Sequence, residues 1–238
     1  MPSRDRVRAA LAKQDPTGLD ADESSLYDRC NQQEIDMSAE LFGADVSKSV
    51  VLREVPWGVR ISPDRIPHVG RPDFARRLGT RLLIVEYKTG DRETAASPAN
   101  EHLRDLAVLG RGNLAGVTDV AVAIIQPALS DRPVGSLYTE PDLARAEKEM
   151  FLRVLASHAP GAPRTAGESQ CRDCRARHGC PEYQRWASAL VPAAQMLVAI
   201  PVSQWTPAQL AQFLEAAAAA AQWIQETLTE ILSQSPRA

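Results

Sequence analysis

The pattern of apolar and polar positions predicts an early helix followed by several strands. Residues 23–43 place Leu26, Cys30, Met37 and Leu41 at roughly helical intervals. The strand-like runs that follow are 50–55, 58–61, 68–74 and 81–87. The last run has a continuous apolar core, which is typical of a buried strand, and residues 76–79 suit a hairpin turn before it.

The remaining pattern predicts two more helices around one more strand. Residues 98–110 favour a helix, residues 117–126 a strand, and residues 141–157 a helix with Pro141 in its first turn. Helices and strands in this order predict an α/β fold with a mixed central sheet flanked by helices.

The C-terminal region predicts a separate helical extension. Thr206 and Pro207 form a favourable helix start, a capping hydroxyl followed by proline. Apolar residues then recur three and four positions apart: Leu210, Leu214, Ala217, Ala221, Ile224, Leu228 and Ile231. This stripe fits packing on the protein's own body or a homo-oligomer formed through the helix. We therefore expect a first domain over 1–190 and an extension over 191–238.

Composition excludes several classes of protein. With 44% apolar and 24% charged residues, the 238-residue chain is an ordinary globular protein. Its net charge of −3 means that any nucleic acid must bind through a local basic patch. The most apolar stretch, 190–202, is too short to span a bilayer, and the first residues lack the apolar core of a signal peptide. We expect a cytoplasmic protein with no membrane partner.

One pair of segments carries candidate chemistry. Glu86 and Lys88 alternate with Tyr87, so on a strand they point to the same face. A hairpin would bring Asp73 alongside them. Two carboxylates suit a hard cation such as Mg²⁺, which can activate water and polarise a phosphoryl oxygen, while a lysine can offset developing charge. A surface hairpin with a salt bridge is the alternative interpretation.

The sequence pattern GRPDF…LLIVEYKTG resembles motifs of the PD-(D/E)XK nuclease superfamily, in its RecB-like branch. The resemblance implies that Asp73 and Glu86 bind Mg²⁺ or Mn²⁺ and that Lys88 is the catalytic lysine. Such nucleases often have a further ligand on the first helix, for which Glu40 is the first candidate and Glu34 the second.

A further motif of this branch, Gln-x-x-x-Tyr on the next helix, is altered here. His102 stands where glutamine is expected, and Leu106 stands where tyrosine is expected. The resemblance makes His102 a candidate catalytic residue, and the departure puts substrate contact or full activity in question.

The cysteines form a second candidate site. Cys171, Cys174 and Cys180 lie close in sequence, and Cys30 lies far upstream. This arrangement resembles the iron–sulfur site of AddB-type helicase-nucleases and CRISPR adaptation nucleases, which implies a 4Fe–4S cluster held by all four. The alternative is zinc bound by the three late cysteines and His178, with Cys30 a buried apolar residue.

The two resemblances together imply a metal-dependent DNA nuclease. We expect an exonuclease that acts on DNA ends or single strands in phage or bacterial recombination and repair, with a helicase or annealing protein as a possible partner. The C-terminal segment also resembles a phage-encoded RecB-like family of unknown function. The alternatives are a catalytically weak nuclease-fold DNA-binding or adaptor protein and a zinc-containing nucleic-acid-binding module. Arginines that could contact DNA are Arg76, Arg77, Arg81, Arg104, Arg111, Arg164, Arg172, Arg175, Arg177 and Arg185.

Overall fold

A computed structural model describes residues 3–61, 67–90, 100–171 and 174–187, with parts of the segment 206–221. The chain divides into two compact units, Met1–Pro160 and Gly161–Ala238. Each unit is considered by itself. Within the residues described, no helix combines the length and the apolar character needed to cross a bilayer.

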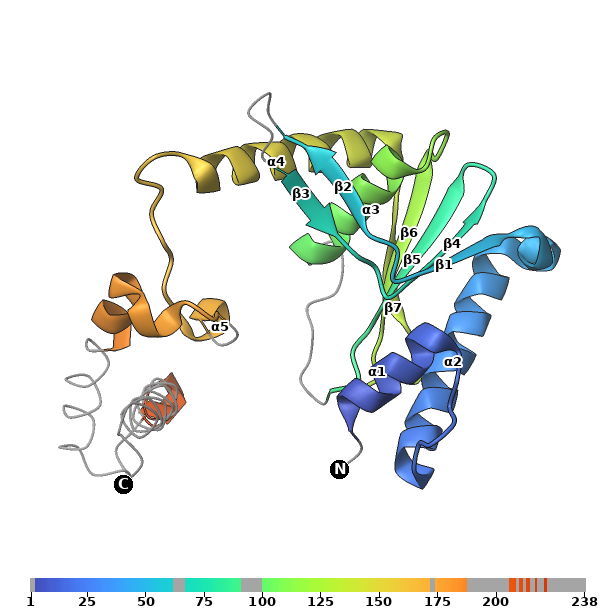
Figure 1. Cartoon of the computed structure of the whole chain (residues 1–238), viewed down its shortest axis with the longest axis horizontal. Helices are drawn as coiled ribbons and strands as arrows, with labels where there is room; N and C mark the ends of the chain where they lie inside the picture. The colour runs from blue at the N-terminus through green and yellow to red at the C-terminus, as the bar shows by residue number, and fades with distance from the viewer. Residues whose placement is uncertain are drawn as a thin grey trace, which may run out of the picture. The chain divides into compact units, whose positions relative to one another are not determined.

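The first unit is an α/β fold with a mixed sheet, as the sequence predicts (Figure 1). Its elements are α1 (Arg4–Lys13), α2 (Ala21–Phe42), the 3₁₀ helix η1 (Gly43–Lys48), β1 (Val50–Arg53), β2 (Trp57–Arg60), β3 (Pro67–Gly70), β4 (Phe74–Leu78), β5 (Arg81–Tyr87), α3 (Glu101–Asn113), β6 (Asp119–Ile125), β7 (Val134–Tyr138) and α4 (Glu140–His158). The main sheet has the order β1-β4-β5-β6-β7. Strands β5 and β6 are parallel, and the other neighbours are antiparallel.

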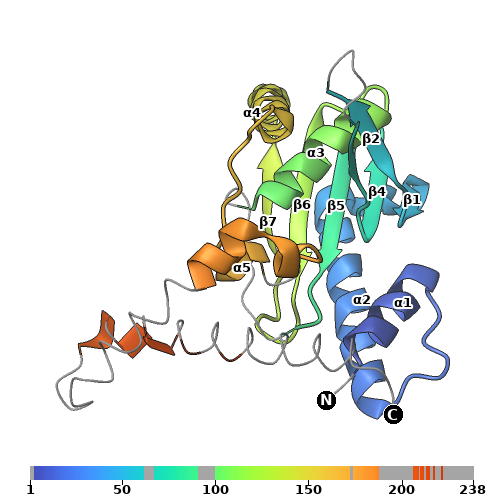
Figure 2. The ribbon, with the colours of Figure 1, turned by 60° about the vertical axis from the view of Figure 1, so that its left-hand side comes forward.

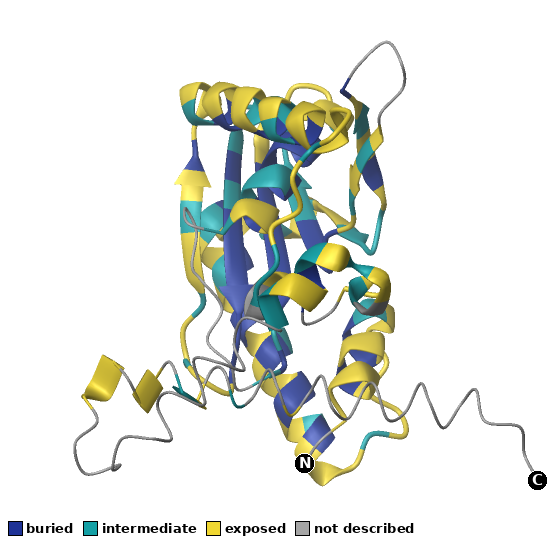
Figure 3. Cartoon of the chain, turned by 90° about the vertical axis from the view of Figure 1, so that its left-hand side faces the viewer, coloured by how far each residue is buried: buried dark blue, intermediate teal, exposed yellow. Residues whose placement is uncertain are grey.

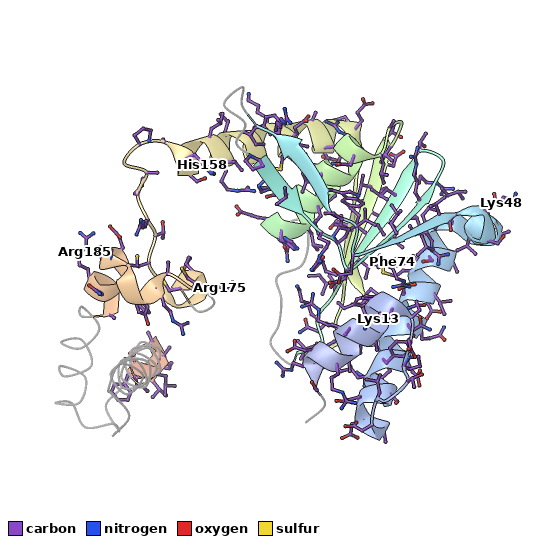
Figure 4. All side chains as sticks on the ribbon, viewed as in Figure 1. Lys13, Lys48, Phe74, His158, Arg175 and Arg185 are labelled. Atoms are coloured by element: carbon purple, nitrogen blue, oxygen red, sulfur yellow. The ribbon has the colours of Figure 1, made fainter. Side chains whose placement is uncertain are left out.

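Alternating side chains of β5 bury both faces of the sheet. Leu82 and Ile84 pack with residues of α3, whereas Leu83 and Val85 pack with residues of α1 and α2. Figure 2 shows α3 lying across β5 and β6, and Figure 3 shows the middle strands buried along their length. Phe74, labelled in Figure 4, belongs to the core that α1 and α2 cover. Helices therefore pack against both faces of the sheet near the end of β5: α3 on one face, and α1 and α2 on the other.

Helix α1 is absent from the sequence prediction. Its buried residues Val7, Ala10 and Leu11 do follow helical spacing, but they span barely more than one turn. Packing against α2 covers this short apolar stripe, which would be a weak signal in isolation. The predicted helix 23–43 corresponds to α2, which begins slightly earlier because Asp20 and Glu23 form a capping box.

The predicted strand 68–74 is divided into two strands that belong to different sheets. Strand β3 pairs with β2 in a two-stranded sheet, and β4 pairs with β1 and β5. Pro72 lies in the break, and a proline cannot donate to a strand ladder. Residues 76–78, expected in a turn, continue β4, and the turn falls at Gly79, whose φ of 60° suits glycine.

The later elements follow the prediction, with one addition. Helix α3, strand β6 and helix α4 correspond to the predicted 98–110, 117–126 and 141–157. Strand β7 is the addition: its largely exposed residues give no clear alternation, and pairing with β6 defines it.

The second unit holds the late cysteines and the start of the predicted tail helix. It contains α5 (Glu168–Cys171), the 3₁₀ helix η2 (Arg177–Gly179) and helical residues 181–187. The Leu210 amide donates to the Thr206 carbonyl at 3.0 Å, which confirms the predicted helix start. Leu210 and Leu214 are exposed, and Ile224, Leu228 and Ile231 lie outside the described residues.

The compact units divide after Pro160, whereas the domain boundary expected from the sequence falls after residue 190. The cysteine segment therefore belongs to the second unit, with the tail, and not to the unit that contains the sheet. Residues 188–205 lie outside the described residues, so the expected boundary itself stays a prediction.

Candidate active site

Two buried carboxylates lie side by side where β5 ends. The pairing of Phe74 with Val85 places Asp73, just before β4, opposite Glu86. The Asp73 amide lies 3.4 Å from Oε1 of Glu86, and the Tyr87 amide donates to Oδ2 of Asp73 at 2.8 Å. Asp73 is 5% exposed and Glu86 is 4% exposed. The structure thus brings together the two predicted metal ligands, although Asp73 lies in the break between β3 and β4 and not inside the predicted strand 68–74.

Two side chains that can carry positive charge approach the same oxygen of Glu86. Lys88 Nζ is 3.4 Å from Oε2, and His102 Nε2 is 3.6 Å from it. Burial raises the pKa of Glu86, but the hydrogen bond from His102 and the charge of Lys88 outweigh burial, so its pKa lies below the ordinary value. Glu86 therefore stays a carboxylate despite its burial.

Close packing of α3 on the sheets brings His102 to this point. The Asn100 side chain caps the helix by accepting from the Leu103 amide at 3.1 Å, so His102 lies in the first turn. A Cβ on Gly70 would lie 2.8 Å from Cδ2 of Leu106. Any residue larger than glycine at this position would therefore force the Leu106 side chain to move. Leu106 stands at the tyrosine position of the Gln-x-x-x-Tyr motif described above. Its side chain is fully buried, so it contributes to the core and not to the site.

The loop after Glu86 is held by the neighbouring strand. The Lys88 amide donates to the Ile125 carbonyl at 2.9 Å, which extends the pairing of β5 with β6. Nε2 of Gln126 donates to the Gly90 carbonyl at 2.9 Å. These bonds fix the Lys88 backbone while its side chain stays partly exposed, 32% of its surface. Gln126 is not among the residues predicted from the sequence, and its place at the end of the predicted strand 117–126 was the available signal.

Arg8 of α1 is a further member of the site that the sequence analysis missed. Its Nη2 lies 2.8 Å from Oδ1 of Asp73. Partial burial lowers the pKa of Arg8, but Asp73, with smaller contributions from Glu86 and Glu54, raises it above the ordinary value overall. The available signal was the helical spacing of Val7, Ala10 and Leu11, noted above.

The structure does not bring Glu40, the preferred first-helix ligand, to the carboxylate pair. Glu40 is exposed, and the next residue, Leu41, accepts a hydrogen bond from Arg81 Nη1 at 2.8 Å. Arg81 begins β5 and Glu86 lies near its other end, a separation of roughly 17 Å along an extended strand. Glu40 therefore lies beside the opposite end of β5.

Glu34, the second candidate, belongs to a separate hydrogen-bond network with Arg53 and Tyr87. Arg53 Nη2 lies 2.8 Å from both Glu34 oxygens, and the Tyr87 hydroxyl donates to the same carboxylate. Burial and the Glu34 charge raise the pKa of the Tyr87 phenol. Since Tyr87 and Glu86 point to opposite faces of β5, Glu34 supports the strand from the face opposite Glu86.

Several arginines expected on a DNA path are bound to protein groups. Arg77 donates to the Gly79 and Ala115 carbonyls at 3.0 and 2.6 Å, Arg76 lies over the Phe74 ring, and Arg81 reaches Leu41. These three lie toward the turn between β4 and β5, away from Asp73 and Glu86. On α3, Arg104 and Arg111 pair with α4 carboxylates, Glu149 at 2.9 Å and Glu147 at 2.6 Å.

The three late cysteines lie on consecutive turns of the second unit. The Cys174 amide donates to the Cys171 carbonyl at 3.2 Å, and amides of Arg177 and Cys180 repeat the three-residue step at 3.3 and 3.1 Å. The Cys180 sulfur also lies 3.9 Å from Arg164 Nη1. These bonds place the three cysteines in one short segment, and their binding of a metal or cluster stays a prediction.

Cys30 has a different environment, inside the first unit. It lies fully buried in the core between α2 and the sheet, and burial raises its pKa to about 12. Cys30 and the late cysteines belong to different units, so their predicted joint binding of one cluster stays a prediction. The His178 side chain, needed for the zinc alternative, lies outside the described residues.

The donor set at the first site consists of two carboxylates. No group of three or more histidine, cysteine, aspartate or glutamate side chains with metal-binding geometry occurs in the described part of the chain. Two carboxylates are nevertheless compatible with Mg²⁺, which usually takes one or two and keeps several waters. The oxygen donors of Asp73 and Glu86 therefore fit a hard divalent cation.

Comparison with known proteins does not identify a family. No protein-family profile matches the chain, and no curated protein matches it. Among solved structures, the crystal structure of SSO0001 is similar, with 17% identity, a TM-score of 0.33, and coverage of 64% of this chain and 69% of that one. A likeness at this level carries no argument about fold or function.

Proposed function

We propose that the protein is a metal-dependent DNA nuclease with a PD-(D/E)XK type of core. The single observation that carries the proposal is that the buried residues Asp73 and Glu86 lie in contact, the Asp73 amide facing the Glu86 carboxylate. Lys88 lies beside the Glu86 carboxylate. Burying two acids is unfavourable unless charges or ligands compensate them, so a divalent cation bound between them would stabilise the pair.

The reaction would be hydrolysis of a phosphodiester bond. Asp73 and Glu86 would hold Mg²⁺ or Mn²⁺, which when bound lowers the pKa of a water molecule and offsets negative charge on the phosphate. The Lys88 ammonium would orient the attacking water and offset charge that develops on the phosphoryl oxygens. The phosphorus–oxygen bond to the leaving nucleotide breaks, leaving one phosphate-ended and one hydroxyl-ended strand.

His102 would act at the edge of this site. Its ring is 56% exposed while Nε2 faces Glu86 at 3.6 Å. It replaces the glutamine of the related pattern, and either side chain can offer a nitrogen donor to a carboxylate. We assign His102 to orienting Glu86, with its exposed edge available to the substrate.

The cysteine segment would hold a 4Fe–4S cluster, with zinc as the alternative occupant. Cys171, Cys174 and Cys180 supply three thiols on consecutive turns, one fewer than such a cluster normally takes. Cys30 is the proposed fourth ligand. Its burial and raised pKa mean that binding must remove a firmly held proton. Iron and zinc analysis of protein purified without oxygen, compared with Cys174→Ser, distinguishes the two metals.

The test of the proposed activity is digestion of end-labelled DNA. Anaerobically purified protein is incubated with single-stranded and duplex DNA and Mg²⁺ or Mn²⁺, beside Lys88→Ala. The matched control is Lys48→Ala, because Lys48 is an exposed lysine on η1 that pairs with Asp45.

We expect metal-dependent cleavage by wild-type protein and Lys48→Ala, and a loss of about 100-fold or more in Lys88→Ala. The pattern of fragments shows whether cleavage starts at ends. Folded, metal-loaded protein that binds DNA without cutting it would overturn the nuclease and favour a DNA-binding or adaptor role.

A further inference from the structure

Arg8 holds Oδ1 of Asp73, the oxygen of this carboxylate that is not bound by the backbone. The backbone amide of Tyr87 holds Oδ2 of Asp73 at 2.8 Å, while Arg8 Nη2 holds Oδ1 at 2.8 Å. A cation bound through Oδ1 would take the place of the guanidinium, because both are positive charges competing for one oxygen. The Tyr87 bond does not oppose that exchange, since it engages the other oxygen.

The guanidinium can leave Asp73 without disturbing its helix. Val7 and Leu11 are fully buried, and Arg6 pairs with Glu23 of α2 at 2.9 Å, so α1 is anchored independently of Arg8. The Arg8 side chain itself is 46% exposed. A long side chain at the edge of a buried site can exchange partners by rotamer changes alone.

The charges at the site indicate which group the displaced Arg8 guanidinium would then bind. The two carboxylates are now compensated by Lys88 and Arg8, which contact one each. Adding a divalent cation creates a surplus of positive charge beside a half-exposed arginine. A phosphodiester supplies the opposite charge, and its oxygens match the donor geometry of a guanidinium.

We propose that Arg8 transfers from Asp73 to a phosphate of the DNA strand when a divalent cation binds. This inference rests on the proposed function, because it assumes a cation at Asp73 and Glu86 and DNA as substrate. Arg8 then has two roles: it compensates Asp73 in the metal-free protein, and it positions the strand in the loaded one. The site would therefore bind metal and DNA cooperatively.

The test measures binding and not cleavage. Mn²⁺ binding is followed by electron paramagnetic resonance, and binding of a labelled single-stranded oligonucleotide by fluorescence anisotropy, with Ca²⁺ to limit cleavage. The variants are Arg8→Gln and the conservative Arg8→Lys. The control is Lys13→Gln, which removes one positive charge from the exposed C-terminal end of the same helix (Figure 4).

We expect Arg8→Gln to bind Mn²⁺ about 3- to 10-fold more tightly, because a competing cation is gone, and the oligonucleotide about 10-fold more weakly. Arg8→Lys should lie between wild type and Arg8→Gln in both assays, and Lys13→Gln should match wild type. Thermal unfolding in the absence of metal checks that each variant is folded.

Other results overturn the inference. Weaker Mn²⁺ binding in Arg8→Gln would mean that Arg8 holds Asp73 in place for the metal, and unchanged binding of both ligands would mean a structural ion pair. Wild-type protein that binds no Mn²⁺ would remove its basis. If the expected shifts occur but no variant cleaves DNA, the exchange stands and the nuclease assignment fails.

Discussion

The backbone N–H of Tyr87 donates a 2.8 Å hydrogen bond to Oδ2 of Asp73. Because Tyr87 directly follows Glu86 in β5, this bond fixes one candidate ligand relative to the other through the main chain. The side chains around the pair can then change partners without separating the two carboxylates. A site held in this way can exchange the Arg8 guanidinium for a metal ion while the two carboxylates stay in place.

Replacing Glu86 should remove metal binding. Glu86→Gln keeps the shape of the side chain but loses its charge, and we expect Mn²⁺ affinity to fall at least about 10-fold and DNA cleavage about 100-fold or more. Glu40→Gln, the same change at an exposed position of α2, should leave both unchanged. Reduced metal affinity in Glu40→Gln would restore the first-helix ligand that the structure places elsewhere.

The stability that Glu86 provides should depend on pH. Since the pKa of Glu86 is lowered on folding from its ordinary value of 4.5, its charged form stabilises the fold above that value. This contribution is lost as pH falls through the lowered pKa. Urea unfolding of wild type and Glu86→Gln between about pH 7 and pH 3 should show a difference that shrinks at the acidic end. A difference independent of pH would contradict the lowered pKa.

Two glycines of α3 should respond oppositely to alanine. A Cβ on Gly110 would lie 2.6 Å from Cδ2 of Leu82 and 3.2 Å from the Trp57 ring, so Gly110→Ala should destabilise the protein by about 1–3 kcal/mol. At Gly112 the nearest atom, of Val59, is 3.4 Å away, and Gly112→Ala should stabilise by about 0.5–1 kcal/mol. Chemical denaturation measures both, and equal effects would mean that α3 does not rest on the sheet as described.

Glu34 should prove structural. In Glu34→Gln the Arg53 guanidinium loses its charged partner inside the protein, and we expect a loss of about 2 kcal/mol in unfolding free energy. Mn²⁺ affinity should stay at the wild-type value, because Glu34 lies on the face of β5 opposite Glu86. Weakened Mn²⁺ binding with little loss of stability would instead make Glu34 a metal ligand.

The cysteines should differ in reactivity in the metal-free protein. Cys174 is exposed, whereas burial raises the pKa of Cys30 to about 12 and shields its sulfur. Because the thiolate is the reactive form, a disulfide reagent should modify Cys174 at least about 100-fold faster than Cys30 at neutral pH. Peptide mapping assigns the sites, and denaturant should abolish the difference. Rapid modification of Cys30 in the folded protein would contradict its place in the core.

The sequence by itself determined the long elements and the two carboxylates. Helix α2, strands β5 and β6 and helices α3 and α4 carry enough periodic apolar residues to be recognised locally. The alternation of β5 likewise placed Glu86 and Lys88 on one face. These properties follow from spacing along one segment, which sequence records directly.

Only the tertiary structure decided what meets that segment. Arg8 and Asp73 are 65 residues apart, and their contact depends on a short helix that is defined by packing on α2. The sequence ranks Glu40 before Glu34 as a metal ligand, but the structure pairs Glu34 with Arg53 and leaves Glu40 exposed. His102 reaches Glu86 because glycines allow α3 to lie close to the sheets. Such contacts join residues distant in sequence, and the energies that select them, burial and charge compensation, arise only once the chain has packed.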